Sequence, residues 1–374
     1  MKGLENIYKR IKDSSDKFLG YPLAKDFTFS EFAPFLDLCI NNVGDPEAKS
    51  TLTIDTKEVE KKCISFFADI LSTTVNDVWG YVTNGGTEGN LYGLYLAREC
   101  YPEAVVYYSE STHYSVKKNL HLLNMRNIVV RSQENGEIDY EDLEQILTIH
   151  RDKPAVFFLN VGTTMTEAVD DLEKIKTIIK KYAIKDYYIH CDAAFLGTIA
   201  PFVEPKPKFD FSEGVDSISI SGHKFIGGPI PCGIVMCKRA HRNRVANSIS
   251  YVGTLDTTIT GSRNGLTPLF LWSFIEKHGK DGLKRRVCES QELAAYTERK
   301  LNEIGVNAWR NKEALTVVFD KPSKKVCEKY QLASEEAIAH IICVPGIKKE
   351  RIDSLLFDLE NEQKEKENLV LLEA

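Results

Sequence analysis

The sequence lacks several features that define whole classes of proteins. Its nine cysteines are scattered, and no two of them form a C-x-x-C pair, so the usual spacing of a structural zinc site is missing. No stretch approaches the roughly 20 apolar residues that a membrane-spanning helix requires. Residues 1–17 are rich in Lys, Glu and Asp and have no apolar core, unlike a secretory signal. We therefore expect a cytoplasmic protein with reduced thiols and no metal site.

An excess of positive charge is also missing. The formal net charge is −6 at pH 7, which argues against a protein that binds nucleic acids through a broad basic surface. A hydrophobic fraction of 43% in a chain of 374 residues is enough for a sizeable core without disulfide support. The composition therefore predicts a globular protein whose partners are neither nucleic acids nor membranes.

The central part of the chain alternates strand-like and helical segments. Strands are expected over 79–83, 105–109, 128–130, 155–161, 187–191, 217–220 and 233–237. Helices are expected over 90–100, from about 115, over 140–149 with Asp139 as N-cap, and over 170–182. Such alternation predicts an α/β fold with a mainly parallel sheet and helices on both faces. Ligands of such sheets bind beyond the carboxyl ends of the strands.

The pattern changes after residue 265. A long helical stretch over 266–304 precedes an apolar run over 315–319, and more helix is expected after it. This predicts a smaller α+β domain at the C-terminus. We divide the chain into an N-terminal segment over 1–50, a large domain over 51–281 and a small domain over 282–374.

A glycine-rich segment, TNGGTEGN over 83–90, lies between an expected strand and an expected helix. Its glycines allow the backbone to approach a ligand closely, and the N-terminus of the helix offers free N–H groups to a phosphate. The segment has neither the G-x-G-x-x-G pattern of dinucleotide sites nor the G-K-[ST] of a P-loop. The alternative is a tight turn that binds nothing.

Two further segments end on reactive side chains. In HCDAA, over 190–194, Asp192 follows a buried strand and precedes two small residues, so its carboxylate faces an open, flat space unless it only caps a helix. In SISGHKFIGG, over 219–228, Lys224 stands at the end of an apolar strand. Partial burial lowers the pKa of a lysine amine and makes it a nucleophile that can form a Schiff base. A surface loop lysine is the alternative.

Taken in order, these segments resemble the fold-type I pyridoxal phosphate (PLP) enzymes, and among them the group II amino acid decarboxylases. The resemblance runs over most of the chain and is closest to the branch of the bacterial PLP-dependent histidine decarboxylases and plant serine decarboxylases. It is carried by NNVGDP (41–46), WGYVTNGGTEGN (79–90), YYSESTHYSV (107–116), GEIDYEDL (136–143), NVGTT (160–164), YYIHCDAAFLG (187–197), SISGHKFIGGPIPCG (219–233) and TITGSRNG (258–265). It implies the fold-type I PLP-dependent transferase fold, with PLP bound in the large domain over 51–281.

The resemblance also implies a role for individual residues. Lys224 would bind PLP covalently, and Asp192 would keep the pyridine nitrogen protonated so that the ring can accept electrons from the α-carbon. Ala194 would lie against one face of the ring and His113 would stack on the other. The phosphate would be bound by Gly86, Thr87, Ser221 and His223.

Three more residues are implied at the edge of this site. Thr164 would lie near the ring hydroxyl of PLP or the substrate carboxylate. Ser262, in TGSRNG, resembles the serine that the partner subunit donates to the phosphate, which implies a homodimer, or a higher oligomer, with a shared active site. Tyr251 resembles the loop tyrosine that protonates the α-carbon, although it could equally be a core or surface tyrosine.

The resemblance implies an enzyme whose substrate would be an L-amino acid and whose products would be the primary amine and carbon dioxide. L-Histidine is the first expectation and L-serine the second, and another small L-amino acid stays open, because Leu266 stands where both relatives usually carry His. An aminotransferase would require an arginine for the substrate carboxylate, for which Arg310 is a candidate. A non-catalytic homologue is disfavoured by the joint presence of Lys224, Asp192 and His113, since a binding module needs no buried amine.

Overall fold

A computed structural model describes residues 2–249 and 253–373, and these residues form two compact units. The larger unit comprises residues 27–164 and 168–285. The smaller unit comprises residues 1–26, the short segment 165–167 and residues 286–374. No helix among the described residues is long and apolar enough to cross a membrane.

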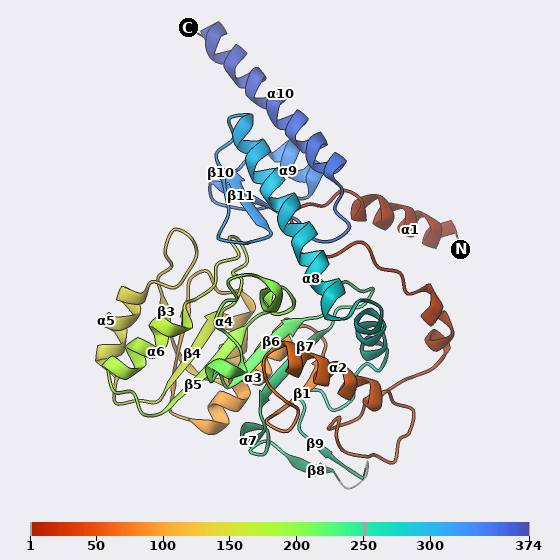
Figure 1. Cartoon of the computed structure of the whole chain (residues 1–374), viewed down its shortest axis with the longest axis vertical. Coiled ribbons are helices and arrows are strands. Elements are labelled where there is room, and N and C mark those ends of the chain that lie inside the picture. Colours follow the sequence, from red (N-terminus) through yellow and green to blue (C-terminus); the bar gives the residue numbers. More distant parts are fainter. Residues whose placement is uncertain (1, 250–252, 374) are drawn as a thin grey trace. The chain divides into compact units, whose positions relative to one another are not determined.

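The larger unit is built on a seven-stranded sheet with the order β1-β7-β6-β5-β4-β2-β3 (Figure 1). The strands are β1 (Val78–Thr83), β2 (Val105–Ser109), β3 (Arg126–Val130), β4 (Ala155–Asn160), β5 (Tyr187–Asp192), β6 (Ser217–Ser221) and β7 (Gly233–Lys238). β7 pairs antiparallel with both of its neighbours, and the pairs among β2 to β6 are parallel. The predicted α/β class with a mainly parallel sheet is therefore confirmed.

Helices alternate with these strands because the connections of a parallel sheet must return along its faces. They are α2 (Lys57–Ile70), α3 (Gly86–Cys100), α4 (Ser115–Leu123), α5 (Tyr140–His150), α6 (Leu172–Lys181) and α7 (Arg239–Arg242). Asp139 caps α5, as predicted, and Asp171 caps α6. The core between α3 and the sheet is rich in aromatic side chains, among them Trp79, Tyr81, Tyr92 and Tyr188.

The helical stretch predicted over 266–304 is α8 (Leu266–Glu303), but it is interrupted. Gly279 has φ 55° and ψ −164°, a conformation that an L-residue with a side chain rarely adopts, so the helix bends sharply there. The residues of α8 up to Arg285 belong to the larger unit and those from Arg286 to the smaller unit. A short ribbon of β8 (Asn247–Ile249) and β9 (Thr254–Asp256) precedes α8.

The smaller unit contains a four-stranded antiparallel sheet with the order β10-β11-β13-β12. Its strands are β10 (Ala308–Trp309), β11 (Thr316–Asp320), β12 (Ala333–Glu335) and β13 (Ile338–Ile342), and its helices are α1 (Lys2–Ser15), α9 (Lys324–Tyr330) and α10 (Lys349–Glu373), together with the second part of α8. The predicted apolar run over 315–319 is β11. The helix expected after this run is present as α9 and α10, and the strands β12 and β13, which were not predicted, lie between these helices and complete the sheet.

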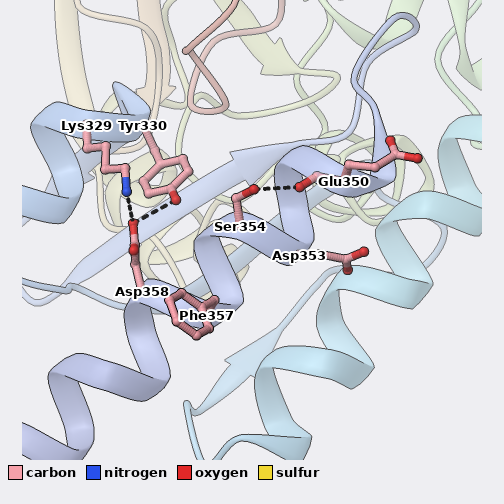
Figure 2. A pocket seen from close by; sticks show the side chains of 7 residues that line it. All are labelled: Lys329, Tyr330, Glu350, Asp353, Ser354, Phe357 and Asp358. Carbon is pink, nitrogen blue, oxygen red and sulfur yellow. Dashed lines mark hydrogen bonds and ion pairs between the residues drawn. The ribbon is translucent and has the colours of Figure 1, made fainter.

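A surface pocket of about 520 Å³ lies on the smaller unit, and Figure 2 shows the side chains that line it. Lys329 Nζ and Tyr330 Oη both donate to Asp358 Oδ2, at 2.5 and 2.7 Å. Ser354 Oγ donates to the backbone oxygen of Glu350 at 2.8 Å. None of the predicted site residues lines this pocket, so it is not the candidate active site.

Candidate active site

Polar side chains end several neighbouring strands of the larger unit. Thr83 ends β1, Asn160 ends β4, Asp192 ends β5 and Ser221 ends β6, and all four are buried. The register places Asn160 opposite Asp192 and Asp192 opposite Ser219. Because these strands run in the same direction, their carboxyl ends meet at one edge of the sheet, where ligands of such folds bind.

The glycine-rich turn brings the predicted phosphate-binding residues together. Gly85 has φ 143°, which a glycine adopts without strain, and α3 begins at Gly86 with no side chain as its cap among the described residues. A Cβ atom at Gly86 would lie 2.8 Å from Ser221 Oγ and 3.3 Å from Ala194 Cβ. Only a glycine therefore fits between the start of α3 and the ends of β5 and β6, and the N–H groups of this helix start remain available to a phosphate.

Thr87 and His223 lie in the same two segments. Thr87 is half-buried in the first turn of α3. His223 Nδ1 lies 2.7 Å from the carbonyl oxygen and 3.1 Å from the backbone nitrogen of Cys232, and burial lowers the pKa of His223. A Cβ atom at Gly85 would lie 4.0 Å from His223 Cε1, so this ring is next to the glycine turn.

Asp192 lies close enough to Lys224 and His113 to influence the pKa of both. Burial lowers the pKa of Lys224, because it disfavours the ammonium, and the Asp192 carboxylate opposes that shift. Burial also lowers the pKa of His113, while Asp192 raises it and Lys224 lowers it further. A half-buried amine of lowered pKa beside a carboxylate is suited to covalent attachment of an aldehyde.

The His113 ring is held by its own turn. Its Nδ1 lies 2.8 Å from the Oγ of Ser115, the first residue of α4, and its ring centroid is 4.4 Å from that of Tyr114. These two contacts hold the ring plane, which is what the predicted stacking role requires.

The sequence reasoning missed two residues that contact the predicted site. Asn90 Nδ2 donates to Asp192 Oδ2 at 2.7 Å, and Asn90 Oδ1 lies 3.0 Å from His190 Nε2. Both side chains are buried. A signal was present, because His190 stands two residues before Asp192 and therefore points to the same face of the strand, and Asn90 lies one turn into α3.

Three predicted residues are not joined to this group by any contact described here. Thr164 is exposed. Ser262 is also exposed, and its Oγ accepts a hydrogen bond from Asn41 Nδ2 at 3.2 Å. Tyr251 lies outside the described residues. The predicted lysine, aspartate, histidines and phosphate-side residues are thus placed around the carboxyl ends of β5 and β6, and the remaining three stay predictions.

The arrangement fits PLP. The start of α3, which has no side-chain cap among the described residues, offers N–H groups to a phosphate. Lys224 supplies an amine, and Asp192 supplies a carboxylate whose Oδ1 and Oδ2 accept from Ala194 N and Asn90 Nδ2 at 3.1 and 2.7 Å. When bound, PLP would supply an electron-accepting ring.

Comparison with known proteins agrees with this site. Residues 55–321 match the pyridoxal-dependent decarboxylase conserved domain. The chain is 46% identical to histidine decarboxylase of Mesorhizobium japonicum, covering 96% of this chain and 97% of that protein, and 44% identical to histidine decarboxylase of Morganella morganii, covering 91% of each. The structure of L-methionine decarboxylase from Streptomyces sp. 590 is similar as well, with a TM-score of 0.90 and 26% identity over 96% of this chain and 94% of that one. The chain therefore belongs to the pyridoxal-dependent decarboxylase family and is a carboxy-lyase that uses pyridoxal 5'-phosphate.

Proposed function

We propose that this enzyme removes the α-carboxylate of L-histidine as carbon dioxide and produces histamine. The observation that supports this substrate is the 42–46% identity to proteins named histidine decarboxylase, which extends over more than nine-tenths of the chain. The geometry supports the reaction type, because Lys224, Asp192 and His113 surround one position at the edge of the sheet.

Each residue of the group has a task in this proposal. Lys224 would hold the cofactor through its amine. Asp192, as a buried carboxylate, would favour a proton on the ring nitrogen. His113 and Ala194 would hold the ring between them. Gly86, Thr87, Ser221 and His223 would bind the phosphate, and Thr164 would contact the ring hydroxyl or the substrate carboxylate.

L-Serine, with ethanolamine as product, is the second candidate, because NNVGDP over 41–46 resembles the serine decarboxylases and Leu266 replaces the usual His. An aminotransferase is less well supported. Its carboxylate-binding candidate, Arg310, donates to Glu298 Oε2 at 2.8 Å and to the carbonyl oxygen of Ala314 at 3.0 Å.

The experiment that tests substrate and reaction together offers each of the common L-amino acids to the PLP-loaded enzyme. Carbon dioxide and the amine are both measured. Histamine and carbon dioxide in equal amounts, with histidine giving the highest kcat/KM, is the expected result. Ethanolamine from serine at a higher kcat/KM would move the assignment to the second candidate. A keto acid without carbon dioxide would overturn the decarboxylase proposal.

The proposal includes a homodimer, because Ser262 would complete the phosphate site of the partner subunit. Lys224→Ala and Ser262→Ala subunits, each inactive or impaired alone, are mixed under conditions that allow exchange. Partial recovery of activity is expected, since one of the two sites in a hybrid dimer is then intact. No recovery despite proven exchange would contradict a shared site. A cytoplasmic location belongs to the same proposal, and the nine free cysteines agree with a reducing compartment.

Tyr251 is proposed as the proton donor to the α-carbon. A phenol has a reference pKa of ~10 and can deliver one proton to a carbanion. Tyr251→Phe keeps the ring and removes only that proton, so substrate binding and carbon dioxide release should persist while amine formation slows. Rapid measurement of carbon dioxide and amine in a single turnover tests this. Equal rates for both in the variant would mean that the proton comes from elsewhere, with His113 as the next candidate.

A further inference from the structure

A continuous line of buried hydrogen bonds in the larger unit leads to Asp192. All of its side chains are buried, and His190, Ser217 and Tyr188 have no measurable exposure, at 0% each. The line runs from Tyr188 Oη to Ser217 Oγ (3.0 Å), on to His190 Nδ1 (2.7 Å), from His190 Nε2 to Asn90 Oδ1 (3.0 Å), and from Asn90 Nδ2 to Asp192 Oδ2 (2.7 Å).

The direction of every hydrogen bond in this line follows from the carboxylate. An ionised Asp192 only accepts, so the amide nitrogen of Asn90 must face it and the amide oxygen must face His190. His190 Nε2 therefore carries a proton. Burial lowers the pKa of His190 to about 3, so the ring is neutral and has no second proton on Nδ1. Nδ1 thus accepts from Ser217, whose oxygen accepts in turn from Tyr188.

Tyr188 favours this direction over the opposite one. If a proton were on Oδ2 of Asp192, that oxygen would donate to a rotated Asn90 amide, and His190 Nδ1 would in turn donate to Ser217. One of the two hydroxyl protons of Ser217 and Tyr188 would then have no acceptor, because the described residues give these hydroxyls no hydrogen-bond partners other than each other and His190. A buried donor without a partner is costly, so the line favours Oδ2 as an acceptor.

We propose that Tyr188, Ser217, His190 and Asn90 form a hydrogen-bond chain of fixed direction that keeps Asp192 Oδ2 an acceptor and orients the carboxylate toward the cofactor ring. Asn90 and His190 are then positioning residues, since they act through Asp192 and touch no reacting atom. This inference rests on the proposed role of Asp192 at the ring nitrogen.

Helix α3 is shaped to hold the histidine of this chain. A Cβ atom at Gly93 would lie 2.2 Å from His190 Nδ1 and 2.3 Å from Cε1, so the ring occupies the space above this glycine. Asn90 is one helical turn before Gly93 and reaches the other nitrogen of the same ring. The helix that begins at the predicted phosphate site thus also fixes the tautomer of His190.

The test compares His190→Phe with His190→Gln in enzyme loaded with PLP labelled with nitrogen-15 in its ring. Phenylalanine keeps a ring and removes both nitrogens, whereas a glutamine amide can still donate to Asn90 and accept from Ser217. In His190→Phe we expect the ring nitrogen to lose its proton at a lower pH, the apoenzyme to bind PLP more weakly, and kcat to fall by about 10- to 100-fold, the range that loss of outer-shell partners gives in metal sites. His190→Gln should restore most of each property.

A second pair of variants tests the chain without changing the histidine. Tyr188→Phe removes the first donor of the chain, and Tyr92→Phe removes a nearby buried hydroxyl that has no partner among the described residues. Only Tyr188→Phe should lower the pH at which the ring nitrogen loses its proton. Other titratable groups near Tyr188 include Asp216, Cys237, Cys100 and His241, whose ring centroid is 5.1 Å from that of Tyr188, and they are the same in all variants.

Three results would overturn the proposal. The first is that folded His190→Phe loses the ring-nitrogen proton at the same pH as the wild type. The second is that His190→Phe and His190→Gln lose it at the same pH, and the third is that Tyr188→Phe and Tyr92→Phe do. Asp192→Asn shows whether such a result contradicts only the hydrogen-bond chain or also the proposed role of Asp192 at the ring nitrogen. If that variant also leaves the protonation of the ring nitrogen unchanged, Asp192 is not its partner and the proposed role of Asp192 is wrong.

Discussion

The larger and the smaller unit each bury a carboxylate, and the two have different kinds of partner. Asp192 of the larger unit accepts from the side chain of Asn90, through which it is connected to His190. Glu167 of the smaller unit accepts from the backbone N–H of Leu315 and from the N–H and hydroxyl of Thr316, at 2.5–3.1 Å. Asp192 also accepts from the backbone N–H of Ala194, so the difference lies in what stands behind the donors. The side-chain donor of Asp192 belongs to a series of further buried side chains, whereas all the donors of Glu167 belong to Leu315 and Thr316 and connect one chain segment to another. We propose that Asp192 serves chemistry and Glu167 serves structure.

A shifted pKa alone would not have separated these roles. Burial raises the pKa of Glu167 to about 7 and that of Asp170 to about 6, and both carboxylates are bound by backbone N–H groups. Shifts of this kind often mark catalytic groups, but structural networks produce them as well. Asp192 differs because Lys224 and His113 lie within its electrostatic reach. The candidate site is therefore identified by the charged side chains around a carboxylate, and not by the size of its pKa shift.

The largest expected effect comes from removing the amine beside Asp192. Lys224→Ala deletes the covalent attachment point of PLP, so the visible absorbance of the bound cofactor should change and decarboxylation should fall by about 10³-fold or more, the scale seen when a covalent nucleophile is lost. Circular dichroism checks that the fold persists. Wild-type turnover in this variant would remove Lys224 from the site.

Asp192→Asn should have the next largest effect on turnover. The substitution keeps the shape of the side chain and removes the charge that favours a protonated ring, which typically costs about 10²-fold in rate. The matched control is Glu167→Gln, which makes the same chemical change in the smaller unit and should leave kcat nearly unchanged. If the two substitutions lowered kcat equally, the distinction between the two carboxylates would fail.

The sequence predicted the strands of the larger unit within a few residues, because most of them are short runs of buried residues. β3 is the exception, since only Val130 is buried in it. The sequence also predicted Lys224, Asp192 and the glycine turn, because their segments match those of related enzymes. It did not predict β12 and β13, since β12 is only three residues long, with Glu335 exposed. It also missed Asn90 and His190, whose role depends on contacts between residues 100 positions apart.

Glu167 gives a pH-dependent prediction for stability. Its pKa is raised from 4.5 to about 7 in the folded protein, so between these values the unfolded state loses its proton first. Stability should therefore fall as pH rises from about 4.5 to about 7, by on the order of 1–3 kcal/mol, and then level off. Urea unfolding of the wild type and of Glu167→Gln across this pH range measures it. The variant can differ in absolute stability, but its decrease with pH should be smaller.

An equal decrease with pH in the two proteins would show that other groups cause it. Asp170 is the main competitor, because its pKa is also raised by burial, to about 6, and it titrates in the same range. The same urea unfolding of Asp170→Asn shows how much of the remaining decrease in stability with pH comes from Asp170.

The smallest expected effect concerns a carboxylate that binds backbone at the surface. Asp171 Oδ1 accepts from the N–H groups of Glu173 and Lys174 at 2.9 and 3.2 Å and so caps α6 in the larger unit. Asp171→Ala removes this cap and should lower stability by about 1 kcal/mol, while Asp171→Asn, which keeps an acceptor oxygen, should cost less. Neither variant should change kcat, because α6 carries none of the proposed site residues. A fall in kcat larger than the loss of folded protein, measured by titrating bound PLP, would mean that carboxylates bound to backbone also affect the chemistry of this unit.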